Sequence, residues 1–291
     1  MTELRWNPDF QSSTDLDRPV LAVAFKGLFD ASGAATSALE WLSNYFPVIK
    51  LGEIDPETFF DFTQERPTVS FGEDGGRELQ WPSNEINALK TPEGQRDLVV
   101  IAGVEPHLRW RTFSAVLTEV AHQVQAETVT TLGSMIGMIP HTRPLTIIGS
   151  STNHDLAKRL GLNRPSYQGP TGLVGALHDT LDKANMPVLS LRVSVPHYIP
   201  DAPNPKATRA LLRRFEMVTG IDTGYMGLDS DASDWEKRVD EAVAGDPEIT
   251  AYVSRLEMQS DQSEEKMPSG DDLAAEFEAF LRDHNRSSDD Q

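Results

Sequence analysis

Two glycine-bearing turns hold residues of this sequence that could bind a negatively charged ligand. The first turn contains Gly27, Asp30 and Gly33, and the second contains Gly169 and Gly172. Both precede predicted helices, whose first backbone N–H groups are free to point at an anion. Neither turn has the spacing of a Walker A loop or a complete dinucleotide-binding fingerprint. Turn geometry and close packing are therefore the competing interpretation.

A third candidate is the turn Pro140-His141-Thr142-Arg143-Pro144, which lies between two predicted strands. It places the titratable imidazole of His141 beside the guanidinium of Arg143, at a sheet end where α/β proteins often bind ligands. The alternative is that the turn simply packs, with Arg143 bonded to carbonyl groups or to an acidic residue.

Basic residues also gather on one face of the helix predicted after Pro205, namely Lys206, Arg209 and Arg213. We interpret this face first as a solvated one with ordinary surface ion pairs, which contribute little stability. The alternative is a dock for acidic groups, either of the chain's own C-terminal part or of a partner.

The sequence lacks the residues or spacings that several other kinds of site require. The sequence has no cysteine, so disulfides, thiolate metal sites and cysteine nucleophiles are excluded. Gly133-Ser134-Met135-Ile136-Gly137 has the wrong spacing for a serine nucleophile elbow. The seven histidines form no metal-binding motif. We expect no catalytic residue, no metal and no cofactor.

The elements that position these turns alternate in type along the chain. Apolar runs predict strands at 20–25, 48–54, 98–102, 128–132, 145–148 and 188–195. Helical periodicity predicts helices near 35–46, 113–124, 155–160, 173–184 and 206–218, and a short helix at 55–60. Gly75-Gly76 predicts a hairpin between 68–71 and 78–81. One mixed sheet with helices on both faces accounts for this order.

The C-terminal part differs in composition. Residues 229–291 carry 19 acidic and 6 basic side chains, which is −13 of the net charge of −19. Residues 229–234 are interpreted as a connection, followed by helices at 235–243 and 248–258, and residues 259–270 are expected to lack fixed structure. A last helix is predicted at 271–285. Its apolar stripe of Leu273, Phe277, Phe280 and Leu281 predicts either a tethered interaction element or a helix packed on the core.

Composition and charge limit the compartment and the partners. Residues 1–20 are polar and interrupted by Pro8 and Pro19, unlike a secretory signal, and no apolar run is long enough to span a membrane. The net charge of −19 argues against nucleic acid and anionic lipid as partners. We therefore expect a cytoplasmic protein.

Several strings, in order and at similar spacing, resemble one family. They are Phe25-Lys26-Gly27-Leu28-Phe29-Asp30-Ala31, Asp55-Pro56-Glu57, Phe60-Asp61-Phe62, Arg66-Pro67, residues 140–144 and 167–172, Val195-Pro196-His197-Tyr198 and Pro205-Lys206-Ala207. Together they resemble the family of the second proteasome assembly chaperone, and its actinobacterial members in particular. The resemblance implies a three-layer α/β/α core similar to purine nucleoside phosphorylases, with small symmetric oligomers. It also implies chaperone or scaffold roles in proteasome assembly, and no catalytic residues.

Combining the residues and the resemblance, we expect an N-terminal arm at 1–19, an α/β core at 20–220 and an acidic helical extension at 221–291. The expected function is that of a non-enzymatic protein-interaction or assembly-chaperone-like factor, acting as a homo-oligomer with a trimer as best guess. The alternative is a small-molecule binder or enzyme, of phosphorylase or hydrolase type, that uses the turns at 27–30, 141–143 and 169–172. The chain ends in Ser288-Asp289-Asp290-Gln291. Archaeal relatives can instead carry a hydrophobic-Tyr-any-residue ending for proteasome docking, which this chain lacks.

Overall fold

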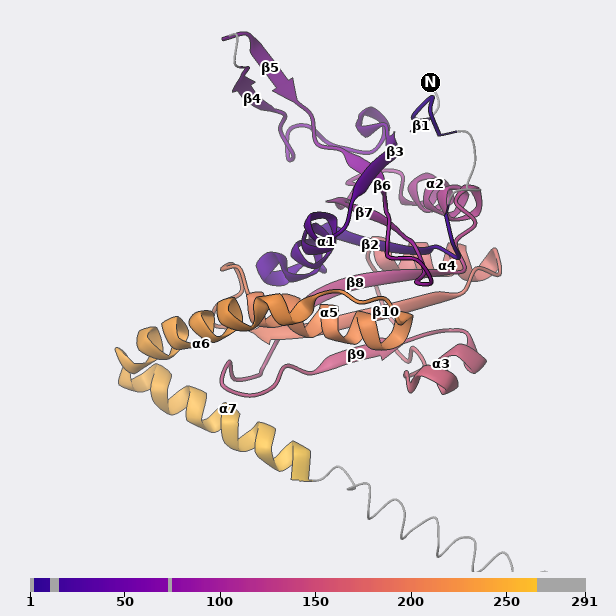
Figure 1. Cartoon of the computed structure of the whole chain (residues 1–291). Coiled ribbons are helices and arrows are strands. Elements are labelled where there is room, and N and C mark those ends of the chain that lie inside the picture. The colour runs from indigo at the N-terminus through magenta and orange to yellow at the C-terminus, as the bar shows by residue number, and fades with distance from the viewer. Residues whose placement is uncertain (1–2, 11–15, 73–74, 266–291) are drawn as a thin grey trace, which may run out of the picture.

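The computed structural model describes residues 3–10, 16–72 and 75–265, and these residues form one large mixed sheet with helices around it (Figure 1). The eight strands are ordered β1-β3-β6-β7-β2-β8-β10-β9. They are β1 (Leu4–Trp6), β2 (Val20–Lys26), β3 (Val48–Ile54), β6 (Asn84–Leu89), β7 (Leu98–Val104), β8 (Thr128–Gly137), β9 (Ile147–Ser150) and β10 (Val188–Pro196). The central strands β7, β2, β8 and β10 pair in parallel, and the outer strands pair antiparallel.

Helices cover both faces of this sheet. On one face, α2 (Trp110–Gln123) and α4 (Leu173–Lys183) pack on Leu21, Val23 and Phe25 of β2. On the other face, α1 (Ala34–Tyr45) and α5 (Pro205–Thr219) pack on Val20, Ala22 and Ala24 of the same strand. A central strand that is buried on both faces explains the uninterrupted apolar run at its start. The predicted three-layer α/β/α architecture is confirmed.

Side-chain caps fix where several helices begin. The buried Asp30 carboxylate accepts hydrogen bonds from the backbone N–H groups of Ala35 (2.8 Å) and Thr36 (3.2 Å) at the start of α1. The side chain of Asn204 accepts from the N–H of Ala207 (2.9 Å), with Pro205 at the first position of α5. Asn153 caps the short α3 (His154–Leu160) in the same way. Each cap satisfies backbone donors that a helix start leaves free.

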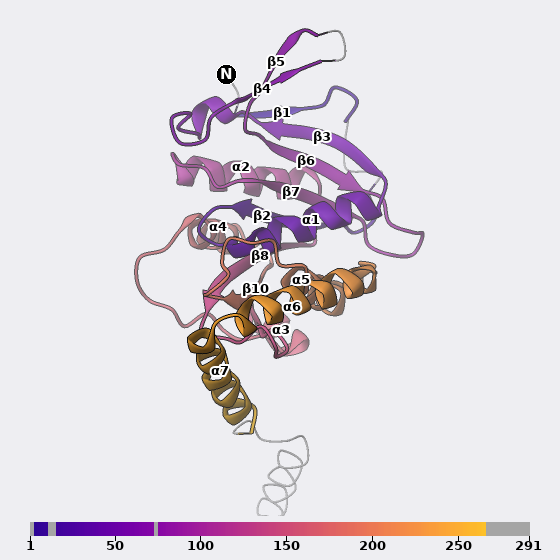
Figure 2. The ribbon, with the colours of Figure 1, turned by 90° about the vertical axis from the view of Figure 1, so that its left-hand side faces the viewer.

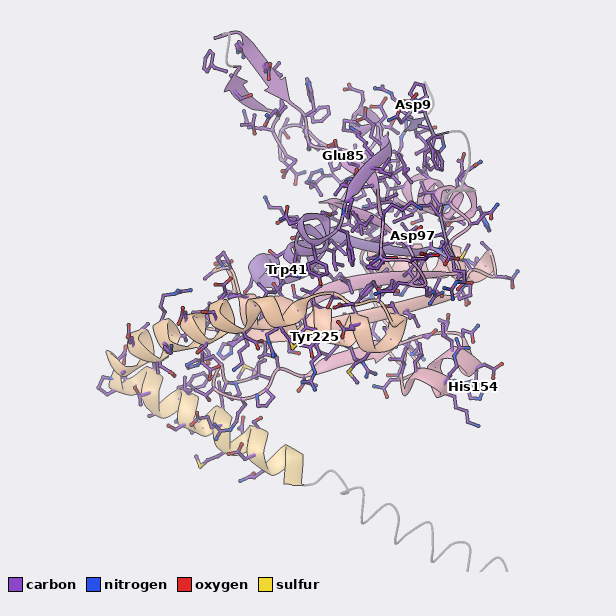
Figure 3. All side chains as sticks on the ribbon, in the orientation of Figure 1. Asp9, Trp41, Glu85, Asp97, His154 and Tyr225 are labelled. Carbon is purple, nitrogen blue, oxygen red and sulfur yellow. The ribbon has the colours of Figure 1, made fainter. Side chains whose placement is uncertain are left out.

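Short elements connect these layers. They are the 3-10 turns η2 (Ala31–Gly33), η3 (Pro56–Thr58) and η4 (Tyr225–Leu228), and the hairpin β4 (Thr68–Phe71) and β5 (Arg77–Gln80). The hairpin forms a separate two-stranded sheet and projects away from the body (Figures 1 and 2). The indole of Trp41 on α1 donates to the carbonyl of Thr223 (2.9 Å), which fixes the segment between α5 and η4 on the body. Figure 3 labels Trp41 and Tyr225, the first residue of η4.

The structure differs from the sequence predictions in four elements. Strands β1 and β6 were not predicted. Helix α6 (Asp229–Ala244) already includes residues 229–234, which were interpreted as a connection, and α7 (Pro247–Glu265) continues through residues 259–265, which were expected to lack fixed structure. Residues 266–270 and the helix predicted at 271–285 lie outside the described residues. Within the described ranges, no helix is both long and apolar enough to cross a membrane.

Candidate functional site

The turn after β2 and the turn before α4 meet at one carboxylate, that of Glu105. One oxygen, Oε2, accepts from the backbone N–H of Leu28 (3.0 Å), and Oε1 accepts from that of Leu173 (3.4 Å). A Cβ atom at Gly27 would lie 2.4 Å from Oε2, and one at Gly172 would lie 3.3 Å from the ring of Phe29. Both glycines therefore permit close packing, and the chain's own carboxylate occupies one N–H group of each turn, that of Leu28 and that of Leu173.

The other residues of these turns have structural contacts. The carboxylate of Asp30 caps α1 and also accepts from the hydroxyl of Thr36 (2.5 Å). Gly33 has the left-handed backbone (φ 62°) that the start of α1 requires. Gly169 lies in the exposed loop before α4, where the hydroxyl of Tyr167 donates to the carbonyl of Pro170 (2.9 Å). The structure thus brings Gly27 and Gly172 together at Glu105 and gives Asp30 and Gly33 to the start of α1.

His141 is buried and held from both sides of its ring. Its backbone N–H donates to the hydroxyl of Tyr198 (2.8 Å), and its Nδ1 lies 2.7 Å from the same oxygen. Burial raises the pKa of Tyr198 to about 12, so the hydroxyl keeps its proton at neutral pH. On the other side of the ring, Nε2 lies 3.0 Å from Oδ1 of Asp240 on α6. This chain of hydrogen bonds joins the β8–β9 loop to α6.

Arg143 makes the corresponding link to α7. Its Nε and Nη2 atoms donate to the two carboxylate oxygens of Asp261 (2.7 and 2.9 Å), and Nη1 lies 3.5 Å from Oε1 of Glu257. The hydrogen bonds from Arg143 hold the pKa of Asp261 below its usual value. A two-point pair of this kind fixes orientation as well as distance. The turn from His141 to Arg143 thus binds two acidic helices of the same chain, α6 and α7.

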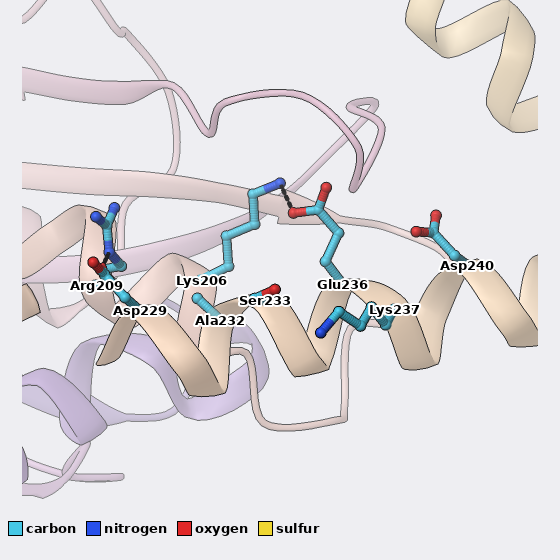
Figure 4. Close-up of a pocket in the computed structure, with 8 residues that line it drawn as sticks. All are labelled: Lys206, Arg209, Asp229, Ala232, Ser233, Glu236, Lys237 and Asp240. Carbon is cyan, nitrogen blue, oxygen red and sulfur yellow. Dashed lines mark hydrogen bonds and ion pairs between the residues drawn. The ribbon is translucent and has the colours of Figure 1, made fainter. Parts of the chain in front are cut away.

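The predicted basic face of α5 also meets acidic residues of α6. Lys206 pairs with Glu236 (2.7 Å) and donates to the carbonyl of His141 (2.5 Å), while Arg209 pairs with Asp229. Arg213 is exposed. A shallow pocket of about 400 Å³ remains between the two helices (Figure 4). Its lining residues are Lys206, Arg209, Asp229, Ala232, Ser233, Glu236, Lys237 and Asp240.

Comparison with known proteins assigns the chain to a family. The sequence pattern of the PAC2 family matches residues 24–243. The chain belongs to the PAC2 family. This confirms the resemblance that the sequence motifs indicated. No curated protein matches the chain.

Solved structures from three organisms resemble this one over most of its length. A PAC2 family protein from Streptomyces avermitilis is 37% identical, and the match covers 81% of this chain and 99% of that one with a TM-score of 0.76. A proteasome-assembly chaperone homologue from Mycobacterium tuberculosis is also 37% identical, with coverage of 81% and 99% and a TM-score of 0.73. An archaeal proteasome activator from Pyrococcus furiosus, at 16% identity, coverage of 83% and 99% and a TM-score of 0.64, shares the fold.

The PAC2 match ends within α6, so α7 and its contacts with Arg143 lie beyond it. The sequence identified the cations Arg143, Lys206 and Arg209 but not their acidic partners on α6 and α7. One signal was present, because Asp229, Glu236 and Asp240 are spaced by seven and four residues and so share one helix face. Tyr198 stood in the string Val195-Pro196-His197-Tyr198, but nothing in the sequence indicated its contact with His141, and Glu105 lay in none of the strings. Among the described residues, no three or more side chains that bind metals lie close together. The predicted contact residues Leu273, Phe277, Phe280 and Leu281 lie outside the described residues.

Proposed function

We propose that this PAC2 protein is a non-enzymatic, cytoplasmic protein-interaction factor of the assembly-chaperone kind, acting as a homo-oligomer with a trimer as best guess. Family membership and the relative named as a proteasome-assembly chaperone homologue support this proposal.

The observation that carries the proposal is the exposure of large apolar side chains on elements that stand away from the core. On the β4–β5 hairpin, Phe71 is 73% exposed, Leu79 47% and Val69 42%. Exposed apolar groups gathered on one projecting element are characteristic of protein-binding surfaces. In contrast, the polar groups of the ligand-binding alternative bond to one another, as Glu105 does with Leu28 and Leu173, and His141 with Tyr198 and Asp240.

The C-terminal segment supplies a second candidate contact. We propose that the predicted helix at 271–285 binds a protein partner through Leu273, Phe277, Phe280 and Leu281, with Arg213 on α5 as a further cation for an acidic partner. Lys206 and Arg209 belong to the same proposed surface, although in this structure they hold Glu236 and Asp229 of α6.

Two baits test the proposal: the full chain and a chain that ends at Glu265. Each is used to recover proteins from an extract of the native organism, and every recovered protein is then purified and mixed with the bait to measure stoichiometry. We expect a defined partner for the full chain, with proteasome subunits as the first to be examined, and weaker recovery by the shorter chain. No reconstituted complex, together with turnover of a nucleoside or ester substrate, would support the enzyme alternative.

A further inference from the structure

The β4–β5 hairpin has one apolar face and one polar face. Its antiparallel register places Val69 opposite Leu79 and Phe71 opposite Arg77, so these side chains share a face. The other face carries Thr68, Ser70, Glu78 and Gln80. At the base, Trp81 packs edge-on against Phe62, with ring centroids 4.7 Å apart, and this contact fixes the hairpin to the body. A two-stranded hairpin is only marginally stable alone, so a molecule that covers its apolar face would stabilise it.

A second apolar surface lies where the parallel strands end. The carboxyl ends of β7, β2, β8 and β10 meet at one edge of the sheet, which we call the carboxyl edge. Leu28 follows β2 and is 72% exposed, Ile136 near the end of β8 is 58% exposed, and Leu108 after β7 is 51% exposed. The exposed cations Lys26, Arg109 and Arg111 lie at the ends of the same strands or in the segments that follow them.

We propose that the apolar hairpin face of one copy of this chain lies on the carboxyl edge of a second copy. The inference rests on the homo-oligomer part of the proposed function and names the contact that forms it. Because the hairpin projects away from its own body (Figures 1 and 2), its face is open to another molecule. One chain carries both surfaces, and they differ, so the contact is of the head-to-tail kind that joins successive subunits.

Charge favours a second copy as the occupant. The chain carries a net charge of −19, yet the segment from Arg109 to Arg111 and the end of β2 at Lys26 are basic. The carboxyl edge is therefore a place where another acidic copy is attracted rather than repelled. Arg77 shares the docking face and Glu78 lies on the opposite one, so the attraction comes from the net charge of the second copy rather than from the hairpin itself. A neighbour seated there covers apolar groups on both molecules at once.

Two double variants and their mixture test this contact. The hairpin variant is Phe71→Ser with Leu79→Ser, and the edge variant is Leu28→Ser with Ile136→Ser. Each removes two exposed apolar groups from one surface, so we expect self-association to weaken about 100-fold or more. Light scattering at micromolar concentration should show an oligomer for the natural chain and a mass near 32.2 kDa for each variant. An equimolar mixture should form a one-to-one dimer, because each variant keeps one intact surface.

Matched controls separate this contact from general loss of apolar surface or of folding. Met217→Ser replaces an apolar residue on α5 that is 63% exposed, and Thr68→Ala with Gln80→Ala alters the polar hairpin face. Both controls should keep the natural mass, and all variants should keep the natural circular dichroism spectrum. A monomeric natural chain would overturn both this contact and the homo-oligomer proposal. An oligomeric natural chain with unchanged double variants, or two monomeric variants that do not pair on mixing, would overturn this contact alone.

Discussion

Glu105 binds the two glycine-bearing turns to each other through its carboxylate. Its carboxylate accepts from the N–H groups of Leu28 and Leu173, so Glu105→Ala leaves two backbone donors without their acceptor. We expect a loss of about 1–3 kcal/mol in the free energy of unfolding, measured by urea denaturation. Added acetate should restore part of the loss by supplying a carboxylate. Glu119→Ala, an exposed change on α2, is the control, and a Glu105→Ala protein as stable as this control would contradict the assigned role.

His178 on α4 is the residue that links stability to pH. Burial, with a smaller contribution from the positive charge of Arg192, lowers its pKa from 6.5 to about 4. The folded state therefore favours the neutral ring, whose Nε2 lies 2.9 Å from the hydroxyl of Thr131. The stabilisation is complete above pH 6.5 and is lost as the pH falls toward 4, with a total of roughly 3 kcal/mol.

The measurement for His178 is the melting temperature between pH 7 and 4. His178→Gln keeps a hydrogen-bonding group but cannot titrate, so its melting temperature should fall less steeply over this interval. His122→Gln, on the exposed face of α2, should follow the natural chain. The assignment fails when the His178→Gln and natural proteins lose stability in parallel. Burial tends to raise the pKa of Asp97, but hydrogen bonds from Lys90, Asp17 and Thr91 lower it overall. The stabilisation from this carboxylate is therefore lost only below the pH range in which His178 acts.

At the scale of elements, the sequence predicts what depends on local periodicity and misses what depends on distant partners. The strand at residues 20–25 and the helix around Phe113 follow from apolar spacing alone. Strand β6 does not, because Asn84 points into the buried side. Its side chain is satisfied there by the N–H (2.9 Å) and carbonyl (3.2 Å) of Val104. Strand β1 has three residues and is defined by pairing with β3.

The acidic cluster at residues 229–234 looked like a connection because Asp and Ser favour turns. In the structure it opens α6, where Asp229 and Asp231 lie in the first turn and complement the helix dipole. Asp229 also pairs with Arg209 of α5, twenty residues earlier. The same limit applies to the candidate site: Lys206 and Arg209 were identifiable from helical spacing, whereas their acidic partners depend on how α6 packs against α5. The partners of Arg143 likewise depend on where α7 meets the β8–β9 loop.

At the scale of the whole molecule, α7 differs from the rest of the body in how it is held. Its attachment combines the buried side chains of Val253 and Leu256, the pairing of Arg143 with Asp261, and a hydrogen bond between Tyr252 and Nε2 of His197 (3.0 Å). Figure 1 shows α7 directed away from the sheet, whereas α5 lies along it. Stability is distributed unevenly in such a molecule, and a helix with few buried contacts opens without global unfolding.

We therefore expect the amides of α7 to exchange with solvent deuterium faster than those of β2 and α5 under native conditions, as followed by mass spectrometry. Leu256→Ala removes one of the few buried groups of α7 and should speed its exchange by about 30-fold or more, because such a truncation costs at least about 2 kcal/mol. The exchange of β2 should stay unchanged, since its neighbours are the layers formed by α1, α2, α4 and α5. Met258→Ala, at a residue of α7 that is 56% exposed, is the matched control. Acceleration of β2 and α7 together in Leu256→Ala would mean that α7 unfolds only with the sheet and is an inseparable part of the core.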